Sequence, residues 1–340
     1  MLGSKDEIRI NQAIVHIMDP GLGMPVLSDA VLDLGPDLAD FLKAHIYRID
    51  TSDDVKNCSF LEDSQIFPLA EEWDSEKFVE ISQKIAGQLY TIMSQNIDIP
   101  GADLLAVEYM VEKHRYLALL KMNYKTSYTH LTNSDPWGNN NDIIQQKAIL
   151  PGETQKLSEA ALIDLDAPQY VRLVEKKYEV NGVKTNYFSK LFLKCSGALS
   201  SKSKLSIVSK AVADVQKKYF NESEQFEAQM ETKSILNREF TEQGGFQVPE
   251  VVDKIFKDHP DMKEEVQEKL EKYHLNEAAV EPQNPATTRK YMTQRLLTDT
   301  GIELKIPMEE YNNKDRIEFI TNSDGTISLL IKNIGSIESR

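Results

Sequence analysis

The sequence predicts an α+β protein, with a mixed or antiparallel sheet and packed helices in its N-terminal and central region. A mostly helical C-terminal region, closed by a β-hairpin, is predicted after it. Three observations predict this class. Strand-like segments are concentrated in the first 187 residues. Apolar residues recur at every third or fourth position in much of the chain after residue 187. Short polar turns join several neighbouring strands, as in antiparallel sheets.

One strand and two helices are predicted within the first hundred residues. Residues 8–17 alternate between the two faces of a strand, with a slip at Asn11-Gln12 that is typical of a β-bulge. Pro36 suits the first turn of the first helix, where the missing N–H would be unpaired anyway. Asp74 or Ser75 can cap the second helix, whose apolar residues form a single stripe.

The central part of the chain is predicted to contain two hairpins. Residues 102–131 are rich in strand formers and predict the first of them. Residues 133–142 are rich in Asn, Asp, Pro and Gly, which predicts a loop that projects from the sheet edge. In the second hairpin, the strands are joined by Asn181-Gly182. This dipeptide tolerates positive φ and therefore favours a two-residue type I′ turn.

Helical spacing predicts the C-terminal elements. The expected helices cover residues 205–219, 222–240, 261–274 and 287–298. A turn at Ser323-Asp324-Gly325 is predicted to fold the last two strands into the closing hairpin.

The 340 residues exceed what one small core uses, so two or three domains are expected. We expect an α/β N-terminal domain over residues 1–160 and a central basic hairpin and helix region over residues 161–222. A mostly helical domain with the terminal hairpin should occupy residues 223–340. No apolar stretch is long enough for a membrane-spanning helix.

The net charge of −15 is unevenly distributed along the chain. Residues 1–100 carry 7 basic and 18 acidic side chains, and residues 221–340 carry 15 and 24. Residues 101–220 carry 17 basic and 12 acidic side chains, a net charge of +5. A basic segment between acidic flanks indicates a surface that faces a polyanion.

Several classes of site lack support in the sequence. Gly21-Leu22-Gly23 begins like a dinucleotide fingerprint, but the third glycine position is Val26 and no helix opens there. Walker A and GxSxG motifs are absent. The six histidines never fall at metal-ligand spacing, and Cys58 and Cys195 lie far apart in sequence. We therefore expect no cofactor, no metal and no disulfide framework, and a reducing, cytoplasmic compartment fits best.

One group of acidic residues suggests an alternative, a Mg²⁺-dependent nuclease. Asp164 and Asp166 end one predicted strand, and Glu175 and Lys177 lie on the next. Carboxylates on adjacent strands can hold Mg²⁺ while a lysine stabilises developing phosphate charge. Charge pairing across the strands is the competing explanation. The nuclease alternative predicts EDTA-sensitive cleavage that Glu175→Ala abolishes.

A basic cluster offers the main candidate binding site. Residues 181–212 contain no Asp or Glu, and lysines there and just before them could contact backbone phosphates without reading sequence. The predicted DNA-binding residues are Arg172, Lys176, Lys177, Lys184, Lys190, Lys194, Lys202, Lys204 and Lys210. A solvated lysine face is the competing explanation. Replacing Lys190, Lys194, Lys202 and Lys204 by Ala should weaken binding to all sequences alike.

Short segments along nearly the whole chain resemble the 37-kDa nucleoid-associated proteins of bacteria, the NdpA-like family. The resemblance is carried by these segments: Ile10-Asn11-Gln12-Ala13 with His16, Arg115-Tyr116-Leu117, Ile163-Asp164-Leu165, Phe192-Leu193-x-Cys195-Ser196 within Phe188 to Ser196, and the closing strand Thr326 to Lys332. Two features depart from the family pattern. Lys194 stands where a small residue, often glycine, is expected, and Glu175-x-Lys177 is not a family hallmark.

The resemblance implies a cytoplasmic, nucleoid-located protein that binds double-stranded DNA with little sequence preference. It also implies association with a type II topoisomerase, and no enzymatic activity. A protein-interaction scaffold, whose acidic faces bind a basic partner without direct DNA contact, is a further alternative. The generous apolar stripes of the helices leave homodimerisation open.

Overall fold

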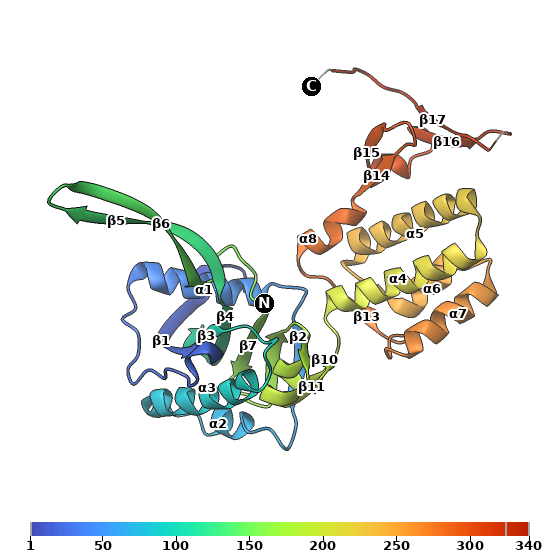
Figure 1. Cartoon of the computed structure of the whole chain (residues 1–340). Coiled ribbons are helices and arrows are strands. Elements are labelled where there is room, and N and C mark those ends of the chain that lie inside the picture. Colours follow the sequence, from blue (N-terminus) through green and yellow to red (C-terminus); the bar gives the residue numbers. More distant parts are fainter. Residues whose placement is uncertain (1, 324, 339–340) are drawn as a thin grey trace. The chain divides into compact units, whose positions relative to one another are not determined.

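The computed structural model describes residues 2–323 and 325–338 (Figure 1). The chain divides into two compact units, Met1–Leu199 and Ser200–Arg340. The predicted mixed α/β character is confirmed, and the sheet is antiparallel throughout. The predicted three-part division stays a prediction. Its boundary after residue 160 lies inside a strand of the first unit, and its boundary after residue 222 lies inside a helix of the second.

A seven-stranded sheet forms the centre of the first unit, in the order β1-β3-β4-β7-β8-β2-β11. The strands are β1 (Ile8–Met18), β2 (Lys56–Phe60), β3 (Ala102–Val111), β4 (His114–Asn123), β7 (Glu159–Asp164), β8 (Tyr170–Val174) and β11 (Cys195–Gly197). Strands β3 and β4 form the predicted hairpin. The predicted bulge is present in β1, where the register with β3 shifts between Ile10 and Gln12.

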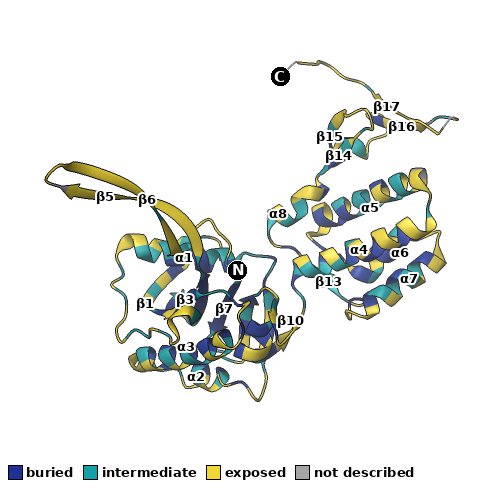
Figure 2. Cartoon of the chain, in the orientation of Figure 1, coloured by how far each residue is buried: buried dark blue, intermediate teal, exposed yellow. Residues whose placement is uncertain are grey.

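Helices cover both faces of this sheet, so its central strands are apolar on both sides. Helix α1 (Pro36–Asp50) packs one face with Leu42 and Ile46, against β3 residues such as Leu105. Helices α2 (Phe67–Glu71) and α3 (Phe78–Ser94) pack the other, where Ile85 lies in one cluster with Leu104. Figure 2 shows the resulting buried centre. Short 3₁₀ turns lie at Lys5–Glu7, Pro20–Leu22 and Ser75–Lys77.

A small hairpin lies beside the sheet, formed by β9 (Tyr178–Val180) and β10 (Val183–Thr185). Its turn residues Asn181 and Gly182 have φ angles of 52° and 78°, as the predicted type I′ turn requires. A short π-helix, Phe188–Leu193, follows the hairpin and leads into β11.

A long ribbon, which we call the arm, projects from the first unit (Figure 1). It consists of β5 (Lys125–Asp135) and β6 (Gly138–Ile149), which pair only with each other. The prediction of a loop at residues 133–142 is wrong, because only Pro136 and Trp137 form the turn. The Asn-rich composition of residues 133–142 is typical of a loop. Cross-strand hydrogen bonds nevertheless join these residues as paired strands; for example, Ser134 Oγ donates to Asn139 Oδ1 at 2.8 Å.

The second unit is mostly helical, with short hairpins. Its helices are α4 (Ser201–Tyr219), α5 (Glu222–Gln243), α6 (Val248–Ile255), α7 (Pro260–Glu271), α8 (Pro285–Thr288) and α9 (Met308–Tyr311), with a 3₁₀ turn at Arg289–Tyr291. Its strand pairs are β12 (Phe246–Gln247) with β13 (Ala279–Val280), β14 (Thr293–Leu297) with β15 (Glu303–Pro307), and β16 (Ile317–Thr321) with β17 (Ile327–Ile331).

The second unit lacks one predicted helix and contains the predicted closing hairpin. The prediction of a helix over residues 287–298 is wrong, because this segment contains the end of α8, one 3₁₀ turn and β14. The closing hairpin is present as β16 and β17, and Asp324 of its predicted turn lies outside the described residues. Within residues 2–323 and 325–338, no helix is long and apolar enough to cross a membrane.

Gly197 of β11 lies in close contact with the backbone of β2. A Cβ atom there would lie 2.1 Å from the carbonyl oxygen of Asn57. We expect Gly197→Ala to lower the free energy of unfolding by about 1–3 kcal/mol or more, because β2 and β11 must separate. Urea unfolding followed by circular dichroism measures this. Gly87→Ala is the matched control, since Gly87 lies in α3 with open space around its Cβ position. If Gly197→Ala had the same free energy of unfolding as the wild-type protein, this would contradict the close approach of β2 and β11.

Candidate nucleic-acid interface

The nine predicted DNA-binding residues are divided between the two units. Arg172, Lys176, Lys177, Lys184, Lys190 and Lys194 belong to the first unit, and Lys202, Lys204 and Lys210 to the second. Neither unit therefore carries all nine of them.

Four of these residues form what we call the lysine patch: Lys176, Lys177, Lys184 and Lys190. Lys176 and Lys177 immediately precede β9, Lys184 lies in β10 and Lys190 lies in the π-helix. All four are exposed, and none forms an ion pair with another residue in the described part of the chain. The Lys176 ammonium lies 5.4 Å from the centroid of the Tyr178 ring.

Local packing holds the lysine patch in place. Val180 of β9 is buried, and the Tyr178 ring meets the Tyr187 ring edge to face with centroids 5.8 Å apart. The Tyr187 ring in turn contacts that of Phe188, the first residue of the π-helix. The hairpin and the helix that carry the lysines are therefore fixed to the same buried aromatic cluster.

The acidic side chains near the lysine patch offset only a small part of its positive charge. Glu175 is almost fully buried and its carboxylate lies 2.7 Å from the Lys56 ammonium. Glu179 is exposed and stands opposite Lys184 in the hairpin register, so it offsets one positive charge. Four lysines facing one exposed carboxylate leave a local positive surface on a chain of net charge −15.

Arg172 and Lys194 already have partners within the first unit. The Arg172 guanidinium pairs with the Asp50 carboxylate and donates to the Asp50 carbonyl oxygen at 2.7 Å. The Lys194 ammonium lies 2.8 Å from Asp63, and this hydrogen bond lowers the pKa of the Asp63 carboxyl. Lys194 also has a φ of 48°, a left-handed conformation that glycine adopts most easily. That conformation accounts for the glycine expected at this position.

The three lysines of the second unit lie on the first half of α4. Ser200 caps this helix by accepting from the Ser203 N–H. Lys204 donates to the Ala279 carbonyl oxygen at 3.1 Å, whereas Lys202 and Lys210 are exposed. Their role in DNA binding stays a prediction.

The structure does not bring the proposed nuclease residues together. Strands β7 and β8 run antiparallel, with Ile163 beside Val171 and Ala160 beside Val174. Asp164 therefore lies at one end of β8 and Glu175 follows the other end. The intervening five residues span about 16 Å.

Each acidic side chain of that group also has a structural partner. Asp164 accepts from the Asp166 and Ala167 N–H groups, and Asp166 pairs with Arg115 at 3.3 Å. Glu175 accepts from both the N–H and the hydroxyl of Ser189. Across residues 2–323 and 325–338, no three His, Cys, Asp or Glu side chains converge as metal ligands. The competing explanation, structural pairing of these charges, fits the geometry better.

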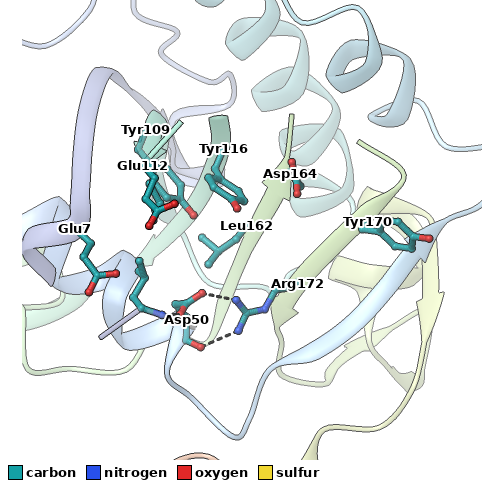
Figure 3. Close-up of a pocket in the computed structure, with 11 residues that line it drawn as sticks. Glu7, Asp50, Tyr109, Glu112, Tyr116, Leu162, Asp164, Tyr170 and Arg172 are labelled. Carbon is teal, nitrogen blue, oxygen red and sulfur yellow. Dashed lines mark hydrogen bonds and ion pairs between the residues drawn. The ribbon is translucent and has the colours of Figure 1, made fainter. Parts of the chain in front are cut away.

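Arg172 and Asp164 line a cavity of about 350 Å³ in the first unit (Figure 3). Tyr109 and Tyr116 stack on its wall with ring centroids 5.2 Å apart. Burial, together with the Asp50 and Asp164 charges, raises the pKa of both tyrosines. The wall also carries Glu7 and Glu112. These acidic groups would repel a phosphate, and Arg172 is already paired with Asp50. The role of Arg172 in DNA binding stays a prediction.

Sequence reasoning missed the exposed apolar side chains of the arm. Tyr128, Trp137 and Ile143 have 69%, 95% and 73% of their surface exposed. The available signal was the strand formers Tyr128, Thr129 and Thr132. The Asn-rich residues that follow them resemble a loop and hid this signal.

The chain matches a known protein family over most of its length. The family model described as NA37, nucleoid-associated protein YejK, matches residues 14–338. No curated protein matches the chain.

Proposed function

The chain belongs to the NA37 family of bacterial nucleoid-associated proteins, and on this premise we propose that it binds duplex DNA through the lysine patch. Binding is to backbone phosphates and shows little sequence preference. The observation that supports the proposal most directly is the exposure of four lysines that have no ion-pair partner among the described residues.

The chemistry of the lysine patch suits a uniform polyanion. An exposed ammonium on a flexible stem contacts phosphate as a point charge and carries no base-specific geometry. The affinity comes from release of condensed counterions, so it falls steeply as salt rises. The strongly negative remainder of the chain repels DNA and restricts contact to this surface.

We propose a non-catalytic role in chromosome organisation. Family membership supports a structural role at the nucleoid. The partners already held by Asp164, Asp166 and Glu175 also support it, because those carboxylates would have to abandon structural bonds to bind Mg²⁺.

The test replaces all four lysines of the lysine patch by Ala in the full chain. Each lost phosphate contact reduces the slope of log K against log salt by about 0.9, so the slope should fall by about 3 to 4. Affinity at about 0.1 M salt should fall by roughly two to three orders of magnitude, alike for unrelated sequences. Fluorescence anisotropy with labelled duplexes across a salt series measures both quantities.

A matched control changes the net charge equally at other exposed lysines. Lys113, Lys257, Lys272 and Lys314 are exposed and lie outside the lysine patch. Their simultaneous replacement by Ala should leave the salt slope nearly unchanged. Equal losses in the two variants would mean that total charge, and not the lysine patch, determines binding. Absence of binding by the wild-type protein at low salt would favour the scaffold alternative.

We also propose, from the resemblance, that the chain associates with a type II topoisomerase. A pull-down of purified topoisomerase with and without nuclease treatment tests this. Retention that survives removal of DNA would support a direct contact, and retention that is lost would mean that DNA bridges the two proteins.

A further inference from the structure

The cavity of about 350 Å³ in the first unit, which we call the acidic cavity, has the size of a small-ligand site, roughly 300–1,000 Å³. Its charged lining residues are Glu7, Asp50, Glu112, Asp164 and Arg172. The Arg172 guanidinium pairs with the Asp50 carboxylate, so these two charges cancel. Three carboxylates remain, and none of them forms an ion pair with another residue in the described part of the chain. The acidic cavity therefore attracts a cation.

A buried tyrosine hydroxyl faces the acidic cavity without a hydrogen-bond partner. Tyr109 is 3% exposed, and its hydroxyl has no partner among the described residues. Figure 3 shows the hydroxyl ends of Tyr109 and Tyr116 directed into the acidic cavity. An unpaired buried hydroxyl costs free energy, which a ligand that donates to its oxygen recovers. A cation with N–H donors therefore suits both the carboxylates and this hydroxyl.

The three unpaired carboxylates are too far apart for a metal ion. Glu7 ends a 3₁₀ turn, Glu112 lies in the turn between β3 and β4, and Asp164 ends β7. Among the residues that the structure describes, no three His, Cys, Asp or Glu side chains converge as metal ligands. The acidic cavity thus presents separated negative charges, which suit a ligand with separated positive charges.

We propose that the acidic cavity binds a linear aliphatic polyamine, such as spermidine. The ammonium groups of the polyamine pair with the separated carboxylates, and one of them donates a hydrogen bond to the Tyr109 hydroxyl. Its methylene segments lie on the apolar part of the lining, which includes Val111 and Leu162. A quaternary ammonium ion fits less well, because it has no N–H to donate. This site is separate from the lysine patch, which attracts anions.

A lysine side chain of another protein is the competing source of the ammonium group. Such a side chain carries one ammonium group on a four-carbon stem, so it pairs with only one of the three carboxylates at a time. The charge left on the other two carboxylates favours a ligand with several ammonium groups.

The test measures spermidine binding to the full chain by isothermal titration calorimetry, at low salt and without DNA. We expect saturation at one spermidine per chain, and we expect excess Mg²⁺ at matched ionic strength to leave it bound. Nα-acetyl-lysine amide should bind at least about tenfold more weakly, because it forms fewer charge pairs. Absence of saturable spermidine binding would overturn the proposal. Equally tight binding of the lysine amide would assign the acidic cavity to a lysine side chain and overturn the polyamine as its ligand.

Tyr109→Phe removes only the hydroxyl that faces the acidic cavity. Spermidine affinity should fall by about tenfold, because hydrogen bonds from charged donors are among the stronger ones. Thermal unfolding should show a stability no lower than that of the wild-type protein, because the lost hydroxyl had no partner. Wild-type affinity in the folded Tyr109→Phe variant would overturn the proposal.

A second variant removes two of the carboxylate charges and keeps the shape of the side chains. Glu112→Gln combined with Asp164→Asn should lower spermidine affinity by about tenfold. The Asn amide oxygen can still accept from the Asp166 N–H, as Asp164 does. The matched control is Glu62→Gln combined with Asp98→Asn, because both residues are exposed and lie outside the acidic cavity. Equal losses in the two double variants would mean that the overall negative charge attracts spermidine, and would overturn the proposal.

Discussion

Lys121→Met is expected to lower the free energy of unfolding by about 3–5 kcal/mol, because it leaves the carboxylate of Glu159 buried without its cation. Both side chains are fully buried, with the Lys121 ammonium 3.6 Å from the Glu159 carboxylate. The two residues face each other across β4 and β7, in the middle of the seven-stranded sheet. Chemical denaturation at neutral pH measures the loss.

A double variant separates the missing charge from the missing contacts. Lys121→Met combined with Glu159→Gln removes both charges and keeps an acceptor for Asn123, which donates to Glu159 at 2.9 Å. We expect the double variant to recover most of the lost stability, because neutral replacement of a buried pair is often tolerated. Equal losses in the single and double variants would show that packing, and not charge, causes the effect.

The pH dependence gives an independent check on Lys121. Burial lowers the pKa of its ammonium to about 8, against the ordinary value of 10.5. Between these two pH values the unfolded state holds a proton that the folded state releases, so stability should rise with pH. The wild-type protein should therefore gain stability relative to the double variant as pH rises from about 8 toward 10.5. A constant difference would mean that Lys121 does not titrate in this range.

The elements that could be predicted from the sequence are those that a few neighbouring residues determine. The turn at Asn181-Gly182 follows from the tolerance of these residues for positive φ, and the bulge in β1 from a two-residue slip in alternation. The arm was missed for the opposite reason. Its tip has the composition of a loop, and its strand form depends on pairing between two polar segments that are each weakly patterned.

The candidate site was harder to predict because it depends on pairing between distant segments. Arg172 and Lys194 lie within a basic run, yet Asp50 and Asp63, more than a hundred residues earlier, neutralise them. Neighbouring residues in the sequence gave no sign of these partners. The exposed lysines of the hairpin could be predicted, because a tight turn leaves polar side chains in solvent.

Glu175→Ala is expected to lower the free energy of unfolding by about 3–5 kcal/mol, the cost of leaving a partly buried lysine and a helix N–H without their acceptor. The side chain of Glu175 is 1% exposed, and it joins Lys56 of β2 to Ser189 of the π-helix. Glu175→Gln should cost less, because the amide oxygen still accepts from Ser189. Lys177→Ala, on an exposed side chain two residues away, should leave stability unchanged. Thermal unfolding of the three variants measures these differences.

The same variants decide between the structural and the nuclease roles of Glu175. The nuclease alternative needs Glu175 to bind Mg²⁺, so Glu175→Ala would keep its fold and lose an EDTA-sensitive cleavage that the wild-type protein shows. The structural role requires intact DNA with wild-type protein and Mg²⁺ on denaturing gels, together with a destabilised variant. Because Asp164 lies at the far end of β8, cleavage would require the sheet register itself to change. We therefore expect intact strands, and a loss of stability that follows the buried contacts of Glu175.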